Sequence, residues 1–273
     1  MVFKWLLLIV GAALLYFWIK GKKQAKEAIN NPSSTKPGKA KIVADPEAMV
    51  PCQYCKVYLP KSDALEFEDR AYCCREHLNA LDEQGWLGSA AWRISPNQDS
   101  RPENSAPDLL VVHHISLPPG EFNDRASSHH IIAFFQNNLD PSLHPYFQEI
   151  ADQKVSSHFL VTRTGQLIQF VSTQQKAWHA GASSFLGREK CNDFSIGVEL
   201  EGDGETPFED VQYQVLARLV SELTKSYPQL QFAGHSDIAP ERKTDPGKSF
   251  DWKKFQKATG LPAEKLPFGL HSR

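Results

Sequence analysis

Hydrophobic and polar positions along the C-terminal two thirds of the chain fall into short blocks that predict strands. A continuous apolar run within residues 108–116 is bounded by polar side chains, which is typical of a buried strand, and residues 194–202 repeat that pattern. Residues 158–162 and 166–171 alternate between apolar and polar positions on either side of Gly165. Such alternation around a turn residue predicts a β-hairpin.

A helical period follows the last of these strands. Apolar residues recur three and four positions apart between residues 210 and 226, and Pro228 lies just beyond them, so we expect one amphipathic helix there. A short apolar stretch then leads to Gly234-His235 and predicts another strand. Strands interspersed with helices indicate an α/β fold, with a mixed central β-sheet flanked by helices. No element is assigned to residues 123–138.

The beginning of the chain has a different pattern. Residues 5–19 are apolar and uncharged, and Val2 and Phe3 extend the run across Lys4. With Lys4 reaching toward the headgroups, this length approaches that of a bilayer-spanning helix, so we expect a transmembrane anchor over residues 1–19. A cleaved signal peptide is the alternative, but lysines follow the run where a small-residue cleavage site would stand.

Charge is unevenly distributed along the chain. The net charge is −2, but residues 20–41 carry seven lysines and one glutamate, which leaves −9 on residues 42–273. An acidic main body argues against a general nucleic-acid binder. Under the positive-inside rule, the lysines after the apolar run predict a single-pass protein of the inner membrane whose main body is cytoplasmic. The Pro-, Ser-, Gly- and Lys-containing residues 20–45 predict a basic flexible linker.

Four potential metal ligands come next in the sequence: Cys52, Cys55, Cys73 and His77. Their spacing predicts a small zinc-ribbon-like module over residues 46–79 that holds a structural zinc ion, with Cys74 as the alternative third sulfur. A disulfide or unpaired cysteines are the other interpretations. The pattern resembles small single-span bacterial proteins of unknown function that carry a CxxC…C…H module, and it leaves the partner of the module unidentified.

Polar side chains also stand at the ends of the predicted core strands. His113 ends one strand, His235 follows another, and Asp245 lies in the next loop. Two histidines and a carboxylate that leave one position open are the make-up of a catalytic zinc site. Glu199 interrupts an apolar strand, where an acidic group is costly unless it is paired or functional, so it is a candidate general base. Because the chain contains ten histidines, composition alone gives this grouping little weight.

Longer motifs strengthen the prediction of a catalytic zinc site. They are collinear and span almost all of residues 80–256: Gly85-Trp-Leu, LLVVHHISLPPGEF (109–122), LDPSLHPYF (139–147), AWHAG (177–181), GREKCNDFSIGVELEG (187–202), GHSDIAPERKTDPG (234–247) and FDW (250–252). In these stretches the chain resembles the AmpD-type 1,6-anhydro-N-acetylmuramyl-L-alanine amidases, members of the zinc amidase superfamily that includes the peptidoglycan recognition proteins. We therefore expect an amidase domain over residues 80–260 and a C-terminal tail over residues 261–273.

The resemblance implies roles and a substrate. His113, His235 and Asp245 would bind one catalytic Zn²⁺, and Glu199 and Lys243 would act on the water and the substrate. The substrate would be an anhydro-muropeptide from cell-wall recycling, cut at the amide between anhydromuramic acid and L-alanine. Two alternatives remain: a periplasmic amidase of intact peptidoglycan, and a non-catalytic sensor that binds muropeptides.

The resemblance also marks candidates for substrate binding: Trp178, His114, Lys154 and Lys190. Trp178 would offer an apolar platform, and His114 stands where the family usually has asparagine. Lys154 and Lys190 correspond to two family arginines suited to holding a carboxylate. Because an ammonium is a point charge and a guanidinium is a bidentate fork, we expect a changed affinity or peptide preference. His179 is expected to support the metal ligands rather than bind the ion.

Overall fold

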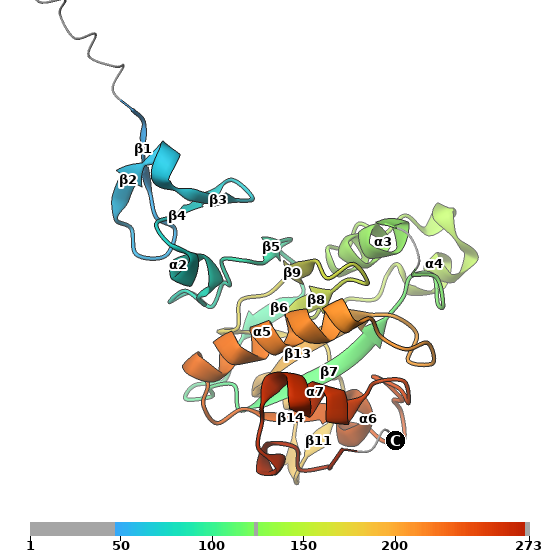
Figure 1. Cartoon of the computed structure of the whole chain (residues 1–273). Coiled ribbons are helices and arrows are strands. Elements are labelled where there is room, and N and C mark those ends of the chain that lie inside the picture. Colours follow the sequence, from blue (N-terminus) through green and yellow to red (C-terminus); the bar gives the residue numbers. More distant parts are fainter. Residues whose placement is uncertain (1–46, 123–124, 271–273) are drawn as a thin grey trace, which may run out of the picture. The chain divides into compact units, whose positions relative to one another are not determined.

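The computed structural model describes residues 47–122 and 125–270, and the described residues from 48 onward form one compact unit (Figure 1). Its centre is a six-stranded sheet. In spatial order the strands are β14 (Gln231–Gly234), β7 (Leu109–Ile115), β13 (Ser195–Glu201), β8 (Phe159–Val161), β9 (Leu167–Gln169) and β5 (Ala91–Trp92). Strands β14, β7, β13 and β8 run parallel, and β9 pairs antiparallel with β8. The predicted mixed sheet of an α/β fold is therefore confirmed.

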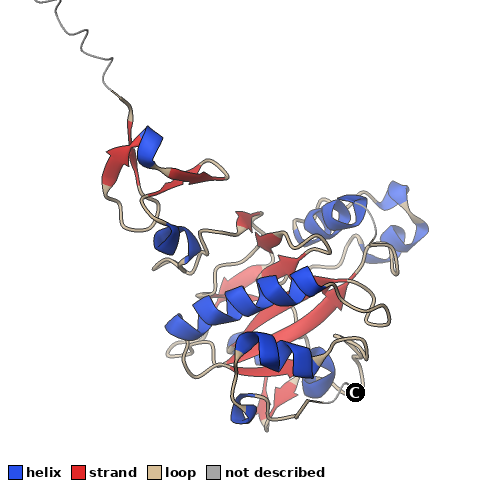
Figure 2. Ribbon diagram, in the orientation of Figure 1, coloured by secondary structure: helices blue, strands red, loops and turns tan. Residues whose placement is uncertain are grey.

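One face of this sheet is covered by two helices, α5 (Asp210–Ser226) and α7 (Trp252–Thr259) (Figure 2). Every second residue of β7 and β13 faces them, because side chains alternate across a strand. Leu110, Val112 and Val198 thus belong to the same buried cluster as Leu216 of α5 and Phe255 of α7. The helix predicted over residues 210–226 has those bounds in the structure.

The opposite face carries the remaining alternate residues. Leu109 and Val111 of β7 pack there with Ile238 of α6 (His235–Ile238). Residues of β8 and β9 pack there with α3 (Arg125–Phe135) and α4 (Pro145–Ile150). His113 and Glu199 lie on this second face, because each is an even number of residues from the positions that point there. The period of the strands therefore places the candidate site away from α5 and α7.

Helix α3 is an element that could not be assigned from the sequence. It occupies most of residues 123–138 and buries Ile131, Phe134 and Phe135 against Leu160 and Ile168 of the sheet. These apolar residues sit at helical spacing, but only over a short run, residues 131–135, which Ser127, His129 and His130 precede. The helix is fixed by tertiary packing more than by its local pattern.

The other elements are short and lie between the long ones. The two-stranded sheets are β1 (Met49–Pro51) with β2 (Tyr58–Pro60), β3 (Leu65–Phe67) with β4 (Arg70–Tyr72), β6 (Gln98–Ser100) with β10 (Gln175–Ala177), and β11 (Ser184–Phe185) with β12 (Arg188–Glu189). In the part of the chain that the structure describes, one more α-helix, α2, spans Arg75–Asn79, and four 3₁₀ turns span Lys61–Asp63, Pro141–Leu143, Cys191–Asp193 and Ala263–Lys265. The first four small strands and α2 make up the predicted Cys/His module.

The expected placement in the inner membrane is corrected here. Among the helices in residues 47–122 and 125–270, none has the length and apolar character that crossing a bilayer requires. The expectation rested on the apolar run of residues 1–19 and the lysines after it, and both lie outside the described residues. A single-pass inner-membrane placement is therefore not supported, and we do not retain it.

Candidate active site

Three polar side chains come into one row across the sheet because of strand register. Glu199 on β13 is the pairing partner of His113 on β7. Gly234, the last residue of β14, pairs with Val112 on the other side of β7, so His235 continues the row beside His113. The carboxyl ends of three parallel strands therefore bring together residues that are up to 122 positions apart in the sequence.

Asp245 reaches this row from the loop after α6. Its Oδ2 atom lies 2.8 Å from His113 Nδ1 and 3.0 Å from His235 Nδ1. The loop is anchored by the Ser236 N–H, which donates to the Asp245 carbonyl at 2.8 Å. Gly234 leaves room for Pro246, the residue after Asp245, since a Cβ at position 234 would stand 2.7 Å from Pro246 Cδ. The two histidines and the aspartate are thus close enough for one ion to bridge.

Hydrogen bonds fix which nitrogen of each histidine faces the aspartate. His235 Nε2 lies 3.1 Å from the Ala180 carbonyl, which can only accept, so Nε2 carries the proton. His113 Nε2 lies 2.9 Å from His179 Nδ1, and His179 Nε2 lies 3.0 Å from Ser195 Oγ. A consistent network has each ring donating through Nε2, which leaves the Nδ1 lone pairs of both ligand candidates free for a metal.

Burial keeps the rings of His113 and His179 neutral, the form that metal ligation requires. It lowers the pKa of His113 to about 4, with His235 adding to the effect and Asp245 opposing it. Burial likewise lowers the pKa of His179 well below its ordinary value. Burial would raise the pKa of Asp245, but the adjacent rings of His113 and His235 outweigh it and lower that pKa. The set therefore combines one carboxylate with two imidazoles, a donor set that suits Zn²⁺.

Glu199 is buried beside this set, with 8% of its surface exposed, and its Oε2 atom has no hydrogen-bond partner among the described residues. Burial and the nearby Asp245 raise the pKa of Glu199 well above its usual range, while Lys243 opposes them. A buried carboxylate oxygen without a partner is costly unless a ligand completes it. Its position and its pKa are those of a group that exchanges protons with a bound molecule.

A cavity of about 330 Å³ opens over these residues. Lys243, Trp178 and His114 line it together with the His/His/Asp set and Glu199. Trp178 is held in place because its Nε1 donates to Asp99 Oδ2 at 2.9 Å. Four of the predicted catalytic or substrate-binding residues, Glu199 included, therefore share one cavity with the candidate metal ligands.

Lys154 and Lys190 are placed differently. Both are exposed, and neither lines the cavity, although Gln153 and Val155 beside Lys154 do. Lys190 precedes the 3₁₀ turn Cys191–Asp193 in a left-handed backbone conformation with φ of 61°. Their suggested role in holding a substrate carboxylate stays a prediction.

Residues that position the histidines were missed in the sequence. Asn192 Oδ1 accepts from the backbone N–H groups of His179 and Ala180 at 3.2 and 2.8 Å, and so fixes the segment that contacts both ligand candidates. Gly197 allows the His179 ring to lie against β13, since a Cβ there would stand 2.6 Å from the ring. A backbone carbonyl such as that of Ala180 has no sequence signature, and Ser195 resembles any strand serine. The motifs AWHAG and CNDFSIG contain all of these residues, but the sequence does not show that residues of one motif contact residues of the other.

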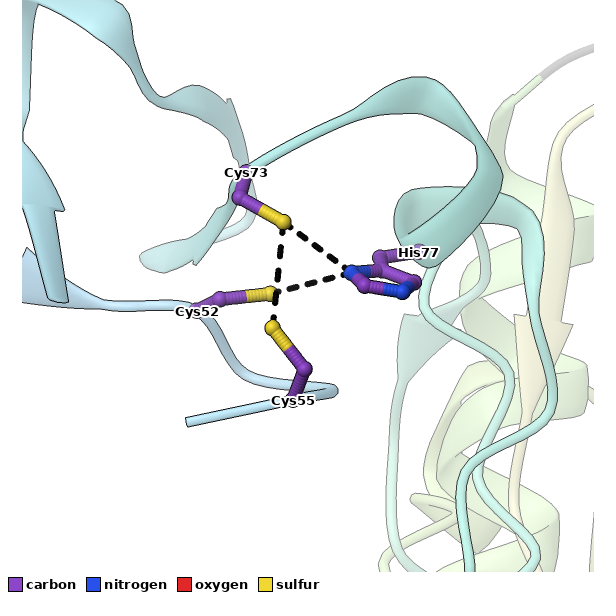
Figure 3. A group of neighbouring side chains, drawn as sticks. All are labelled: Cys52, Cys55, Cys73 and His77. Carbon is purple, nitrogen blue, oxygen red and sulfur yellow. Dashed lines mark hydrogen bonds between the residues drawn. The ribbon is translucent and has the colours of Figure 1, made fainter. Parts of the chain in front are cut away.

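The four residues of the Cys/His module also meet, at a separate place in the structure (Figure 3). Cys73 Sγ lies 3.0 Å from His77 Nδ1, Cys52 Sγ lies 3.8 Å from the same nitrogen, and Cys55 Sγ lies 3.8 Å from Cys73 Sγ. Cys74, the alternative third sulfur, is not part of this group. All five cysteines are unpaired thiols, so the disulfide interpretation is not what the structure has.

A mixed α/β sheet that carries two histidines, an aspartate and a buried glutamate at its strand ends has the make-up of a metal-dependent hydrolase. Comparison with known families agrees: the profile of the family described as N-acetylmuramoyl-L-alanine amidase matches residues 103–248, more than half of the chain. The chain belongs to this family of amidases, whose members are generally zinc-dependent.

Individual relatives give the same result. The chain is 48% identical over 187 residues to the 1,6-anhydro-N-acetylmuramyl-L-alanine amidase AmpD of Salmonella typhimurium, a match that covers 68% of this chain and 98% of the relative. It is 51% identical over 178 residues to AmpD of Escherichia coli, covering 64% and 95%. A crystal structure of a selenomethionine derivative of AmpD superimposes with a TM-score of 0.62 and 50% identity, covering 64% of this chain and 97% of the other. The predicted α/β amidase domain is confirmed by these matches.

Proposed function

We propose that this chain is a zinc-dependent amidase that hydrolyses the bond between 1,6-anhydro-N-acetylmuramic acid and the L-alanine of the stem peptide, in the recycling of peptidoglycan. The row of His113, His235 and Glu199, joined by Asp245, is the observation that carries the proposal. The substrate is suggested by the relatives at about half identity, which are named for this reaction. A non-catalytic sensor is disfavoured because every group that the chemistry needs is present and converges.

His113, His235 and Asp245 would hold the ion through two Nδ1 atoms and one carboxylate oxygen. Zn²⁺ bound there would act as a Lewis acid that polarises the amide carbonyl and lowers the pKa of a water molecule. Three protein ligands leave one position free, which is the arrangement of catalytic rather than structural zinc sites. All three candidate ligands line the cavity.

Glu199 would accept a proton from the attacking water and pass it to the departing amine. The raised pKa of Glu199 suits both proton transfers. A carboxylate with a higher pKa is a stronger base toward water, and the resulting carboxyl group can still release the proton to the departing amine. Lys243 would donate to the carbonyl oxygen as negative charge develops there. Trp178 would present an apolar surface to the sugar or peptide on the same cavity wall.

The proposal is tested with the purified full chain and a matched pair of muropeptides, one ending in 1,6-anhydromuramic acid and the other in its reducing form. We expect release of the stem peptide with a free amino group, measured by mass spectrometry, and a kcat/KM at least about tenfold higher for the anhydro form, the discrimination that one well-placed contact supplies. Equal or faster cleavage of intact peptidoglycan would overturn the recycling assignment. Binding without cleavage would make the chain a sensor.

His179 provides a separate test of how the zinc site is built. His179→Ala removes the acceptor of the His113 Nε2 proton, so we expect the zinc concentration for half-maximal amidase activity to rise about 10- to 100-fold. Activity is titrated in a zinc buffer. His144→Ala is the control, since this histidine caps α4 by accepting from the Tyr146 N–H at 3.1 Å and does not line the cavity. An unchanged zinc titration in His179→Ala would show that the His113–His179 bond does not position the ligand.

A further inference from the structure

The Cys/His module contains a second group of metal-ligating atoms that the amidase reaction does not use. The Sγ atoms of Cys52, Cys55 and Cys73 and a ring nitrogen of His77 all lie within 4.8 Å of one another. They point toward a common centre from two loops and one helix (Figure 3). The relatives match about two thirds of the chain, at most 187 residues, and the amidase family profile begins only at residue 103.

The separations between these atoms are those of a tetrahedral zinc site. A zinc ion with Zn–S bonds of about 2.3 Å and tetrahedral angles holds its sulfurs about 3.8 Å apart. The distance between Cys55 Sγ and Cys73 Sγ is 3.8 Å, and Cys52 Sγ to His77 Nδ1 is also 3.8 Å. Only the contact of 3.0 Å between Cys73 Sγ and His77 Nδ1 is shorter and would open slightly. Three sulfurs and one nitrogen leave no position free for a substrate.

The backbone prepares the group for an ion. Cys52 and Cys55 lie on one tight turn, closed by the Cys52 N–H donating to the Val57 carbonyl at 2.8 Å and the Lys56 N–H donating to the Cys52 carbonyl at 2.9 Å. This turn holds both sulfurs within the group of four ligand atoms. Cysteine binds zinc as the thiolate.

The module needs such an ion, because its own apolar core is very small. Only Cys52, Leu59 and Tyr72 are buried in its cluster. A segment of about thirty residues with so little buried apolar surface does not fold stably without a cross-link or a metal. The three sulfurs are unpaired, and one disulfide among them would leave the third sulfur and His77 without a partner. A metal uses all four.

We propose that Cys52, Cys55, Cys73 and His77 bind a second, structural Zn²⁺ ion that holds the Cys/His module in its folded form on the amidase domain. The module is joined to the segment that leads into β5. Arg70 of β4 donates to the Ala90 carbonyl at 2.6 Å and lies over the Trp92 ring, and Tyr72 donates to the Gly88 carbonyl at 3.3 Å. Cys73 directly follows β4, so the ion would stabilise the strand that makes these contacts.

The proposal is tested by counting metal in the purified full chain. We expect about two zinc ions per chain by mass spectrometry of the metal content, one in Cys55→Ser and one in His235→Ala, since each variant loses a different site. Cys74→Ser is the matched control, because Cys74 is adjacent to a ligand but outside the group, and it should keep both ions. Because the metal count does not depend on turnover, it tests the second zinc site separately from the proposed amidase reaction.

Cobalt gives a readout that misfolding alone does not reproduce. The Co²⁺-substituted chain should show a near-ultraviolet thiolate-to-metal charge-transfer band, because only the Cys/His group supplies sulfur ligands. The Cys55→His variant keeps four ligands but has two thiolates instead of three. We therefore expect the second ion to remain bound and the intensity of this band to fall by roughly a third. The proposal would be overturned if the unmodified chain held one zinc ion and Cys55→Ser still held that ion. A cobalt spectrum without thiolate absorption would also overturn it.

Discussion

Replacing His235 with alanine is expected to abolish amidase activity and to remove one zinc ion from each chain. The change deletes one of three protein ligands and leaves His113 as the one imidazole within reach of Asp245 Oδ2. Loss of the Lewis acid removes several kcal/mol of stabilisation from the transition state, which corresponds to a fall in kcat/KM on the order of 10³-fold or more. The rate is measured on the anhydro-muropeptide and the metal content on the same preparation.

The control for this result is a partly buried, packed histidine outside the site. His130 of α3 packs edge-on against Phe147 with ring centroids 4.9 Å apart, so His130→Ala tests the loss of a packed imidazole without loss of a ligand. It should keep the zinc content and most of the activity. Added zinc should restore chelator-treated unmodified chain but not His235→Ala. Full activity of the unmodified chain after complete removal of metal would contradict the proposed chemistry.

Glu199→Gln is expected to separate the proton-transfer role from metal binding. The amide keeps the size of the side chain but cannot take a proton from water, so we expect amide hydrolysis to fall roughly 10²–10⁴-fold, the usual contribution of a positioned acid–base group. Zinc content should stay at that of the unmodified chain, because Glu199 is not among the atoms grouped around the ion. Rates come from single-substrate kinetics and zinc from the metal count.

Glu201→Gln is the matched control, since it makes the same change two residues along β13. Both oxygens of Glu201 accept from Ser128 Oγ, at 2.9 and 3.0 Å, and one accepts from the Arg163 N–H at 2.9 Å. This carboxylate is structural, so its variant should lose some stability but little catalytic rate. If Glu199→Gln lost zinc together with activity, Glu199 would be a ligand. An unchanged rate would exclude it from the reaction.

Much of the sheet could be predicted from local patterns. The apolar run of β7, the alternation of β8 and β9 and the helical period of α5 are each specified by residues next to one another in the chain. Helix α3 could not be predicted, because its apolar residues become a stable face only when the sheet covers them. A long hydrophobic pattern determines the secondary structure of its own segment. For a short pattern, tertiary packing determines it instead.

The candidate site divides in the same way. The sequence by itself determined which residue types stand at the strand ends, and so the identity of His113, Glu199, His235 and Asp245 as chemistry-bearing groups. The tertiary structure alone decided that they meet, because strand register, not sequence spacing, aligns Glu199 with His113 and leads β14 to His235. It also decided which nitrogen of each ring is free, through Ala180 and His179, since a hydrogen bond between residues far apart in the chain leaves no periodic signal in either segment.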